Sequence, residues 1–509
     1  MNQKRFHYKW WGKGDIDASF GVFFDGFSKI LTATGIMTAV FGMPVSVVIG
    51  KVVPGIGIAV FLGNLWYFFE ARQLAEKEQR QNVTSQPFGI GASQLSGWLY
   101  LIIGPVYWQT KDAELAFQIG LAAAFIGGLV EVTGGFAGRW IVNHVPGSAL
   151  LGNMASSAMI WLSVVGIAMV YDKPEYGLLP LLIIIIDYLG KADRRFKKIP
   201  SGLIAILLGT CIAWADGYLN WGQLQQSFSG LGFYLPSFCL RDIAAGMKGI
   251  VPYLPVIIPL QINNFLSTLQ GLESAKMAGD EYPERRSMIM DGVSTMTGSL
   301  FGNPFPTTVY FGHPGWKELG ARAGFSVVNG ILYLLVCTTG LTGVFMALIP
   351  TEAVMVLLIF VGFSVTESTF RSIDSRYYTT ILLSLLPILF QYVQTMISSA
   401  VQAAGASMEV ISAEVFAKYS VPVKGITYLG NGGFLTSLLL AGLLSCVIDR
   451  NYKAAGCFGL TMAGCAAIGM IHSPEIALFS RGGTMFAMMY LAASVLLFSK
   501  EILLNREQE

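Results

Sequence analysis

The chain has 509 residues, of which 53% are hydrophobic and only 13% are charged, whereas soluble domains carry about 25% charged residues. Its 33 basic and 31 acidic residues leave a net charge of +2, so there is neither a basic field for nucleic acid nor an acidic tail. The composition, with a mean hydropathy of +0.58, excludes a soluble enzyme, a DNA-binding protein and a disordered scaffold. It predicts a polytopic, all-α membrane protein.

Apolar segments recur along the whole chain, and a helix needs about 20 mostly apolar residues to cross a bilayer. We predict fourteen to sixteen spans, the uncertainty coming from segments that are short or broken by Gly and Pro. The sixteen segments are 27–50, 52–70, 86–108, 114–137, 142–170, 176–190, 200–216, 245–271, 287–302, 304–318, 323–348, 352–369, 378–397, 428–448, 454–471 and 482–499.

The positive charges predict the orientation of these spans. With the N-terminus inside, most Lys and Arg residues fall in cytoplasmic loops, as in other multi-pass membrane proteins. A miscounted span would place every later loop on the wrong side of the membrane and reduce the excess of positive charges on the cytoplasmic side. We therefore expect an integral protein of the cell (inner) membrane with both termini in the cytoplasm.

The third and tenth spans are interrupted in the same way. The third opens with Gln86-Pro87-Phe88-Gly89, and the tenth opens at 303–306 with Asn-Pro-Phe-Pro. Proline lacks a backbone donor and glycine is flexible, so each span should begin with extended backbone before a short helix. Paired breaks at corresponding places of two halves indicate the central site of a transporter. Each half would contain seven spans, an odd number, so the second half is predicted to be inverted.

The sequence resembles the nucleobase/ascorbate transporter family, which includes the xanthine, uracil and hypoxanthine/guanine permeases. The resemblance covers about residues 20–400 and rests mainly on NFLSTLQGLESAKMAG (264–279), RRSMIMDGVSTMTGSLFG (285–302), NPFPTTVYFGHPG (303–315) and IVNHVPGSALLGNMASSAMIWL (141–162). It implies a uracil-permease-like fold with a 7+7 transmembrane inverted repeat and short extended breaks in spans 3 and 10. The last two spans would be an added C-terminal two-helix hairpin.

This resemblance also implies a division into domains. A core domain would contain spans 1–4 and 8–11, and a gate domain spans 5–7 and 12–14. The predicted boundaries are a cytoplasmic or interfacial lead-in at 1–26, core parts at 27–137 and 243–348, gate parts at 138–216 and 349–450, an inter-repeat linker at 217–242 and the hairpin at 451–509.

The acidic residues that family members use are missing from this chain. The span-8 acid falls on Asn264 and the span-10 acid on Phe311 or Gly312. The Asn-x-Gly-x4-Thr stretch of the family becomes His313-Pro314-Gly315 with a glycine in place of the threonine, and the Gln-x-His of span 1 is also lost. An amide can form hydrogen bonds but cannot carry a coupling proton. We therefore expect either a displaced acid or transport that is uncoupled, sodium-linked or exchange-driven.

The substrate-binding candidates are polar or aromatic residues beside the breaks. Buried amides need partners, which a solute can supply, although they can equally satisfy the backbone freed at the breaks. Aromatic rings can stack on a planar ligand or simply pack. The candidates are Gln86, Phe88, Ser93, Asn263, Asn264, Asn303, Thr307, Thr308, Tyr310 and Phe311.

Three residues are candidates for coupling, because ionisable groups in membrane segments are costly and usually functional. Glu131, in GGLVEVTGG, is the leading candidate for the displaced acid. Glu367 has Arg371 four residues later, so a surface ion pair is the alternative. His313 could titrate near neutral pH or cap the break. Asp291 is expected to be a helix-start residue.

Together these features predict a secondary-active transporter or symporter of a small polar planar solute, a nucleobase-like purine or pyrimidine, working by alternating access. The first alternative is a carrier of a small inorganic or organic anion on the same fold, and the second is an uncoupled facilitator or channel. H⁺ or Na⁺ would be the coupling ion, and the family resemblance implies a homodimer formed through the gate domain. We expect no enzyme activity, cofactor or metal site, because the sequence lacks HExxH and GxSxG motifs and its histidines are scattered.

Overall fold

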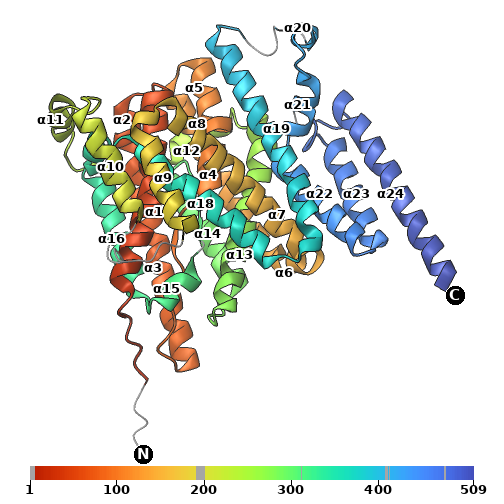
Figure 1. The fold of residues 1–509 in the computed structure, drawn as a ribbon, viewed down its shortest axis with the longest axis horizontal. Coiled ribbons are helices and arrows are strands. Elements are labelled where there is room, and N and C mark those ends of the chain that lie inside the picture. Colours follow the sequence, from red (N-terminus) through yellow and green to blue (C-terminus); the bar gives the residue numbers. More distant parts are fainter. Residues whose placement is uncertain are drawn as a thin grey trace, which may run out of the picture. The chain divides into compact units, whose positions relative to one another are not determined.

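A computed structural model of the chain is mostly helical (Figure 1). It describes residues 6–190, 201–310, 312–406, 411, 413–474 and 477–508. Within these ranges some side chains are also not described, and those of Ser93 and Asn263 are among them.

Short π- or 3₁₀-helical segments, labelled η, interrupt or flank many of the α-helices. The first part contains, in chain order, α1 (Asp15–Gly35), η1 (Ile36–Val40), α2 (Val45–Val47), η2 (Val48–Val52), α3 (Val53–Glu78), β1 (Phe88–Ile90), α4 (Ala92–Trp98), η3 (Leu99–Ile103), α5 (Gly104–Thr110), α6 (Ala113–His144), α7 (Gly147–Ala158), η4 (Met159–Val164), α8 (Val165–Asp172), α9 (Pro174–Gly190), α10 (Ser201–Ala215), α11 (Trp221–Ser229) and α12 (Leu240–Met247). The second part contains η5 (Val251–Tyr253), α13 (Leu254–Met277), α14 (Glu284–Leu300), β2 (Thr307–Val309), α15 (His313–Glu318), α16 (Gly324–Thr338), α17 (Leu341–Leu348), α18 (Thr351–Ser372), η6 (Ser375–Tyr377), α19 (Tyr378–Ala403), α20 (Ala413–Lys418), α21 (Val423–Gly430), α22 (Gly433–Ile448), α23 (Tyr452–Ala467) and α24 (Arg481–Gln508).

Five of the described helical segments are long and apolar enough to cross a membrane. They are Val45–Glu78, Ala113–Phe136, Gly147–Asp172, Ser375–Val401 and Gly482–Leu503. Two further pairs, α16 with α17 and α21 with α22, meet the same criterion together but are bent by 86° and 76°. Counting each bent pair as one span gives up to seven. The larger number of crossings expected from the sequence remains a prediction.

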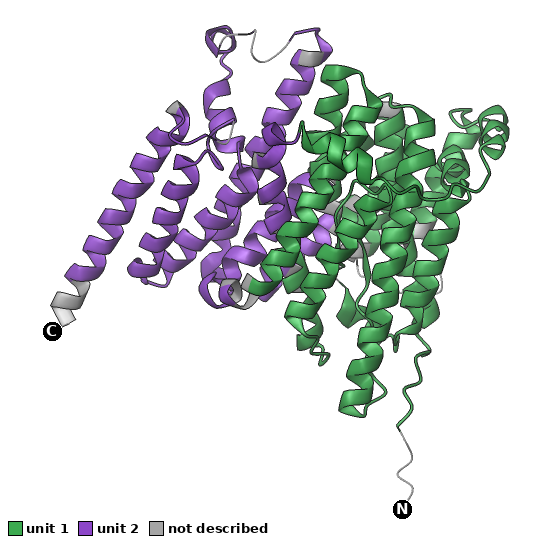
Figure 2. Ribbon diagram, turned by 180° about the vertical axis from the view of Figure 1, so that it is seen from behind, with its two compact units in different colours: residues 1–138, 163–249, 264–361 green, residues 139–162, 250–263, 362–509 purple. Residues whose placement is uncertain are grey.

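The chain divides into two compact units, which are coloured separately in Figure 2. Unit 1 contains residues 1–138, 163–249 and 264–361, and unit 2 contains residues 139–162, 250–263 and 362–509. Both strands belong to unit 1. The candidate functional site is therefore built within that unit.

The two segments predicted to be interrupted meet as a short antiparallel ladder. Phe88 of β1 faces Val309 of β2, and Ile90 faces Thr307. The extended breaks predicted near 86–89 and 303–306 are thus confirmed, and they pair with each other, which the sequence did not indicate. Because the strands are antiparallel, the helices that follow them, α4 and α15, leave the ladder in opposite directions.

Two glycines of α3 allow this ladder to lie close to the helix. A Cβ on Gly63 would collide with the ring of Phe88, and one on Gly55 would collide with the backbone of residues 301–303. Small residues are used in this way wherever backbone must approach a helix. Each broken segment therefore packs directly against α3.

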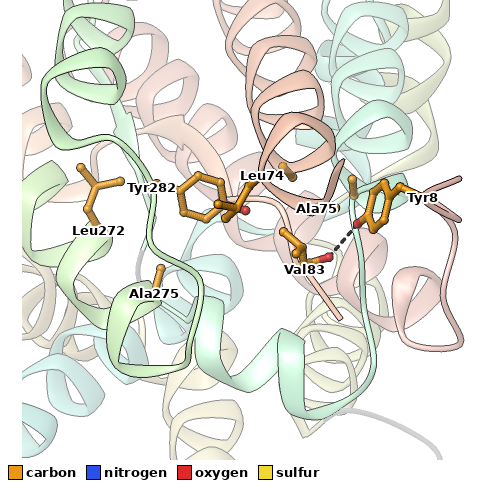
Figure 3. Close-up of a cluster of buried hydrophobic side chains, with 9 residues drawn as sticks. Tyr8, Leu74, Ala75, Val83, Leu272, Ala275 and Tyr282 are labelled. Carbon is orange, nitrogen blue, oxygen red and sulfur yellow. Dashed lines mark hydrogen bonds between the residues drawn. The ribbon is translucent and has the colours of Figure 1, made fainter. Parts of the chain in front are cut away.

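A hydrophobic cluster holds the loop that leads into β1 (Figure 3). It joins Tyr8 of the N-terminal segment, Leu74 of α3, Val83 of the loop and Leu272 of α13. The hydroxyl of Tyr8 donates to the carbonyl of Val83 at 2.6 Å. Burial of these side chains, each contributing about 1.5–3 kcal/mol when complete, fixes the point at which the chain enters the strand pair.

Candidate functional site

Asn264 and Glu131 meet beside β2. The Asn264 amide, on α13, donates to the Glu131 carboxylate, on α6, and also to the carbonyl of Thr307 at 3.0 Å. Both side chains are buried, with exposures of 0% and 1%. The residue predicted to be the displaced acid therefore contacts the asparagine at which the sequence resemblance places the span-8 acid.

Thr295 of α14 connects this pair to the strand. Its hydroxyl lies 3.3 Å from a carboxylate oxygen of Glu131 and 3.0 Å from the hydroxyl of Thr307, and it accepts the Thr307 N–H at 3.0 Å. One threonine therefore contacts both the carboxylate and the strand.

Asp291 contacts β2 from the neighbouring turn of α14. Its carboxylate accepts from the Tyr67 hydroxyl, from the Thr268 hydroxyl at 2.5 Å and from the Val309 N–H at 3.3 Å. Thr268 is also 2.9 Å from the hydroxyl of Thr308. The expectation that Asp291 starts a helix was wrong, because α14 begins about two turns earlier and the aspartate is fully buried in its middle.

Three buried polar groups around the ladder have no hydrogen-bond partner among the described residues. They are the side-chain amide of Gln86, the Oδ1 atom of Asn264 and the hydroxyl of Tyr310. A Cβ on Gly91 would collide with the Gln94 side chain and lie 3.1 Å from Asn264 Oδ1, so the backbone at the start of α4 lies close to this oxygen. Buried polar groups are normally paired, so these atoms are exceptions within the described residues.

Two candidates are engaged in local packing. The Asn303 amide donates to the carbonyl of Phe305 at 2.8 Å, and its oxygen accepts the N–H of the same residue at 2.9 Å. Phe88 packs against Tyr67 and Val309. These contacts favour the structural alternative for both residues, and their binding roles remain predictions. The side chains of Ser93 and Asn263, and the whole of Phe311, lie outside the described residues.

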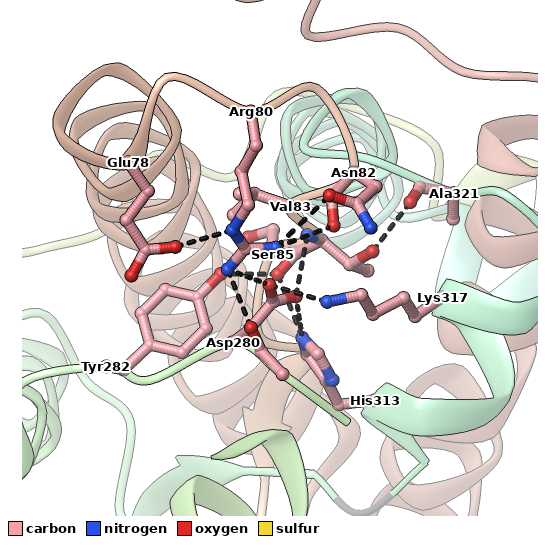
Figure 4. Close-up of polar contacts among 12 residues, drawn as sticks. Glu78, Arg80, Asn82, Val83, Ser85, Asp280, Tyr282, His313, Lys317 and Ala321 are labelled. Carbon is pink, nitrogen blue, oxygen red and sulfur yellow. Dashed lines mark hydrogen bonds and ion pairs between the residues drawn. The ribbon is translucent and has the colours of Figure 1, made fainter. Parts of the chain in front are cut away.

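His313 lies in a cluster centred on Asp280, in the loop between α13 and α14 (Figure 4). Asp280 also pairs with Arg80 at 2.7 Å and Lys317 at 2.6 Å, and accepts the Thr84 N–H at 3.0 Å. Burial alone would raise the pKa of Asp280, but hydrogen bonds from His313, Lys317 and Thr84 outweigh it and lower that pKa below its usual value. The cluster ties the segments on either side of the ladder to one loop.

The last coupling candidate, Glu367, belongs to unit 2 and forms an ion pair with Arg371 on the surface of α18. This is the alternative that the spacing indicated. Such exposed pairs contribute little, about 0–1 kcal/mol.

Several residues of this region were not predicted from the sequence as site residues. Tyr67 and Thr295 carry no signal by themselves, because tyrosines and threonines are common in helices. Asp291 was recognisable as a carboxylate within the apolar run SMIMDGV, and Lys29 as a lysine within the first predicted span. The described residues contain no group of three or more His, Cys, Asp or Glu side chains that could hold a metal ion.

The structure is that of a mostly helical protein with several membrane-compatible helices and two broken segments paired at a buried polar site. No family model matches the chain. In sequence it is 24% identical over 279 residues to the adenine permease AdeP of Escherichia coli (strain K12), a match covering 50% of this chain and 60% of that protein. The predicted resemblance to nucleobase transporters is thereby confirmed, although the match spans less than two thirds of the relative's length.

Two solved structures are similar in fold. The structure of SLC26A9 has a TM-score of 0.52 at 12% identity, covering 85% of this chain and 66% of that one. The transmembrane domain of a cyanobacterial bicarbonate transporter, BicA, has a TM-score of 0.49 at 17% identity, covering 74% and 96% of the two chains. At these identities the likeness concerns the fold alone.

Proposed function

We propose that the chain is a secondary-active membrane transporter of a small polar planar solute, a nucleobase-like heterocycle. The observation that carries this proposal is the buried pair Asn264–Glu131 beside β2, whose amide oxygen has no hydrogen-bond partner among the described residues. The similarity to an adenine permease supports the solute class, and the fold likeness to SLC26A9 supports a membrane transporter. The 7+7 inverted repeat, the movement of core against gate domain and the gate-domain dimer are parts of the same proposal.

The chemistry of the pair suits a heterocycle. An amide both donates and accepts, and a carboxylate accepts the N–H edge of a nucleobase or carries a proton. In the present state the Asn264 amide donates to Glu131. Protonation of Glu131 removes the negative charge that attracts this amide and frees the Asn264 donor for the solute, so proton uptake and solute binding are linked.

The helical run after β1 supports the binding of acceptor groups. α4, η3 and α5 follow one another from Ala92 to Thr110, and Gly91 at their start lies next to Asn264 Oδ1. The N-terminus of a helix carries a partial positive charge and unpaired N–H groups. A ring oxygen or nitrogen of the solute would be stabilised there.

The anion carrier and the uncoupled facilitator remain the alternatives. A carboxylate at the centre of the site disfavours a small anion, because two negative charges would have to share one buried space. The anion carrier is therefore less favoured than the carrier of a neutral heterocycle. The facilitator would not need a titratable group at this place.

The test is transport by the purified full chain in proteoliposomes. We expect adenine, hypoxanthine, xanthine or uracil to raise its thermal unfolding midpoint and to be accumulated against a gradient, and sulfate and bicarbonate to do neither.

Glu131→Gln should abolish accumulation while retaining exchange of internal for external solute. Glu175→Gln, which removes an exposed acid, is the matched control. Accumulation unchanged in Glu131→Gln would contradict the coupling role, and stabilisation by the anions alone would favour the first alternative.

A further inference from the structure

A buried lysine lies beside the strand pair and takes no part in the proposed solute site. Lys29 of α1 has a side-chain exposure of 4%, and its ammonium group binds the Asp25 carboxylate at 2.7 Å. The same nitrogen lies 3.5 Å from the centre of the Tyr310 ring. Asp25 is 29% exposed, so only one member of the pair reaches the protein surface.

Burying an ammonium group is costly unless its surroundings replace the lost water. A carboxylate does so by charge, and an aromatic face does so through the negative potential above its ring. Asp25 and Tyr310 together are therefore the surroundings that a primary alkylammonium ion requires. The Tyr333 hydroxyl, the other titratable group that faces this place, donates to the carbonyl of Phe23 at 3.1 Å.

The position of Tyr310 makes this contact relevant to the ladder. Tyr310 directly follows β2, and its N–H donates to the carbonyl of Pro87, just before β1, at 2.7 Å. Its hydroxyl lies between two glycines, since a Cβ on Gly26 would be 2.9 Å away and one on Gly89 would collide with it. The ring is thus enclosed by α1 on one side and β1 on the other.

We propose that Asp25 and Tyr310 form an ammonium-binding site that the chain fills with its own Lys29, and that this tethered cation fixes Tyr310 and, through it, the β1–β2 pair. Lys29 is then a positioning residue for the broken segments. A role of Lys29 in transport depends on the proposed function, because that function assigns the strand pair to the solute site. The ammonium site does not depend on it and can be tested without any solute.

The experiment uses chemical rescue of the full chain. Lys29→Ala removes three methylene groups and an ammonium, which together correspond to n-propylammonium. We expect the variant to unfold at a lower temperature, and n-propylammonium at about 100 times its Kd to raise that midpoint by at least about 2 °C. The uncharged 1-propanol should not raise it. Lys111→Ala is the matched control, because Lys111 is exposed and 5.8 Å from the Tyr107 ring. Equal effects of the amine and the alcohol, or none from either, would overturn the proposal.

A second measurement covers the case in which Lys29→Ala does not fold. Lys29→Met keeps the length of the side chain but removes its charge, and Tyr310→Leu removes the ring. If the cation acts through the ring, the decrease in the free energy of unfolding of the double variant should be smaller than the sum of the decreases in the two single variants. A decrease in the double variant equal to the sum of the two single decreases would overturn the proposal. A protein that passes both measurements but transports no nucleobase would refute the proposed function and leave the ammonium site standing.

Discussion

The two carboxylates beside β2 differ in what surrounds them: Asp291 contacts the strand directly, whereas Glu131 reaches it through Asn264 and Thr295. Asp291 is held by a tyrosine hydroxyl, a threonine hydroxyl and a strand N–H, all within the protein. Glu131 faces Asn264, whose amide oxygen has no partner among the described residues. The first arrangement is suited to anchoring the strand, and the second to exchanging partners with a ligand. From these different surroundings we predict separate roles for two acids of similar burial beside one strand.

The largest effect is expected from Asp291→Ala. The substitution leaves Tyr67, Thr268 and the Val309 N–H without their common acceptor, which should cost about 3 kcal/mol or more of stability. Thermal unfolding and the yield of folded protein measure it. A variant as stable as the parent would show that the strand does not depend on this anchor.

Asn264→Ala should separate the two roles. We expect the KM for uptake to rise about 10- to 100-fold, because hydrogen bonds worth about 1–3 kcal/mol to the solute are lost. Its unfolding midpoint should fall less than that of Asp291→Ala. A large loss of stability with unchanged KM would instead assign Asn264 to the scaffold.

Asp280→Asn extends the comparison to a carboxylate outside the predicted spans. The folded state lowers the pKa of Asp280, so its stabilising effect is present above the unfolded pKa of about 3.9 and is lost as the pH falls through the lower folded pKa. We expect the variant to be less stable than the parent at pH 7 and this difference to shrink below about pH 4. Unfolding midpoints across this range test it, and a difference independent of pH would contradict the charged role.

Thr295→Val should have the smallest effect on stability, about 1 kcal/mol, because it removes one hydroxyl and leaves the shape almost unchanged. Thr268→Val is its counterpart on the Asp291 side. We expect the Thr295 variant to alter the pH dependence of uptake and the Thr268 variant to leave it unchanged. The same response from both would remove the distinction between the two carboxylates.

The sequence predicted the parts of this site that depend on local chemistry. Proline and glycine act on their own backbone, so the breaks before Phe88 and near Asn303 could be recognised without a structure. The contact between Glu131 and Asn264 joins residues 133 positions apart, and only the packing of α6 against α13 creates it. Asp291 was misjudged because the start of α14 was placed too late, which moved a buried residue to the end of a helix. The Asp280 cluster gave no signal, since charged residues in loops are usually solvated.

The ladder between β1 and β2 has only three residue pairs, and neighbouring side chains of a strand point to opposite faces. Sliding one strand past the other by a single position would bring Thr308 to the place of Thr307, and the replacement would again present a hydroxyl group. The doubled threonine would thus keep a hydroxyl group opposite Thr295 of α14, whereas Val309 would take the place of Thr308 opposite Thr268 of α13. A shift of one position along the strand axis would therefore preserve the hydroxyl contact on the Glu131 side and remove the one on the Asp291 side.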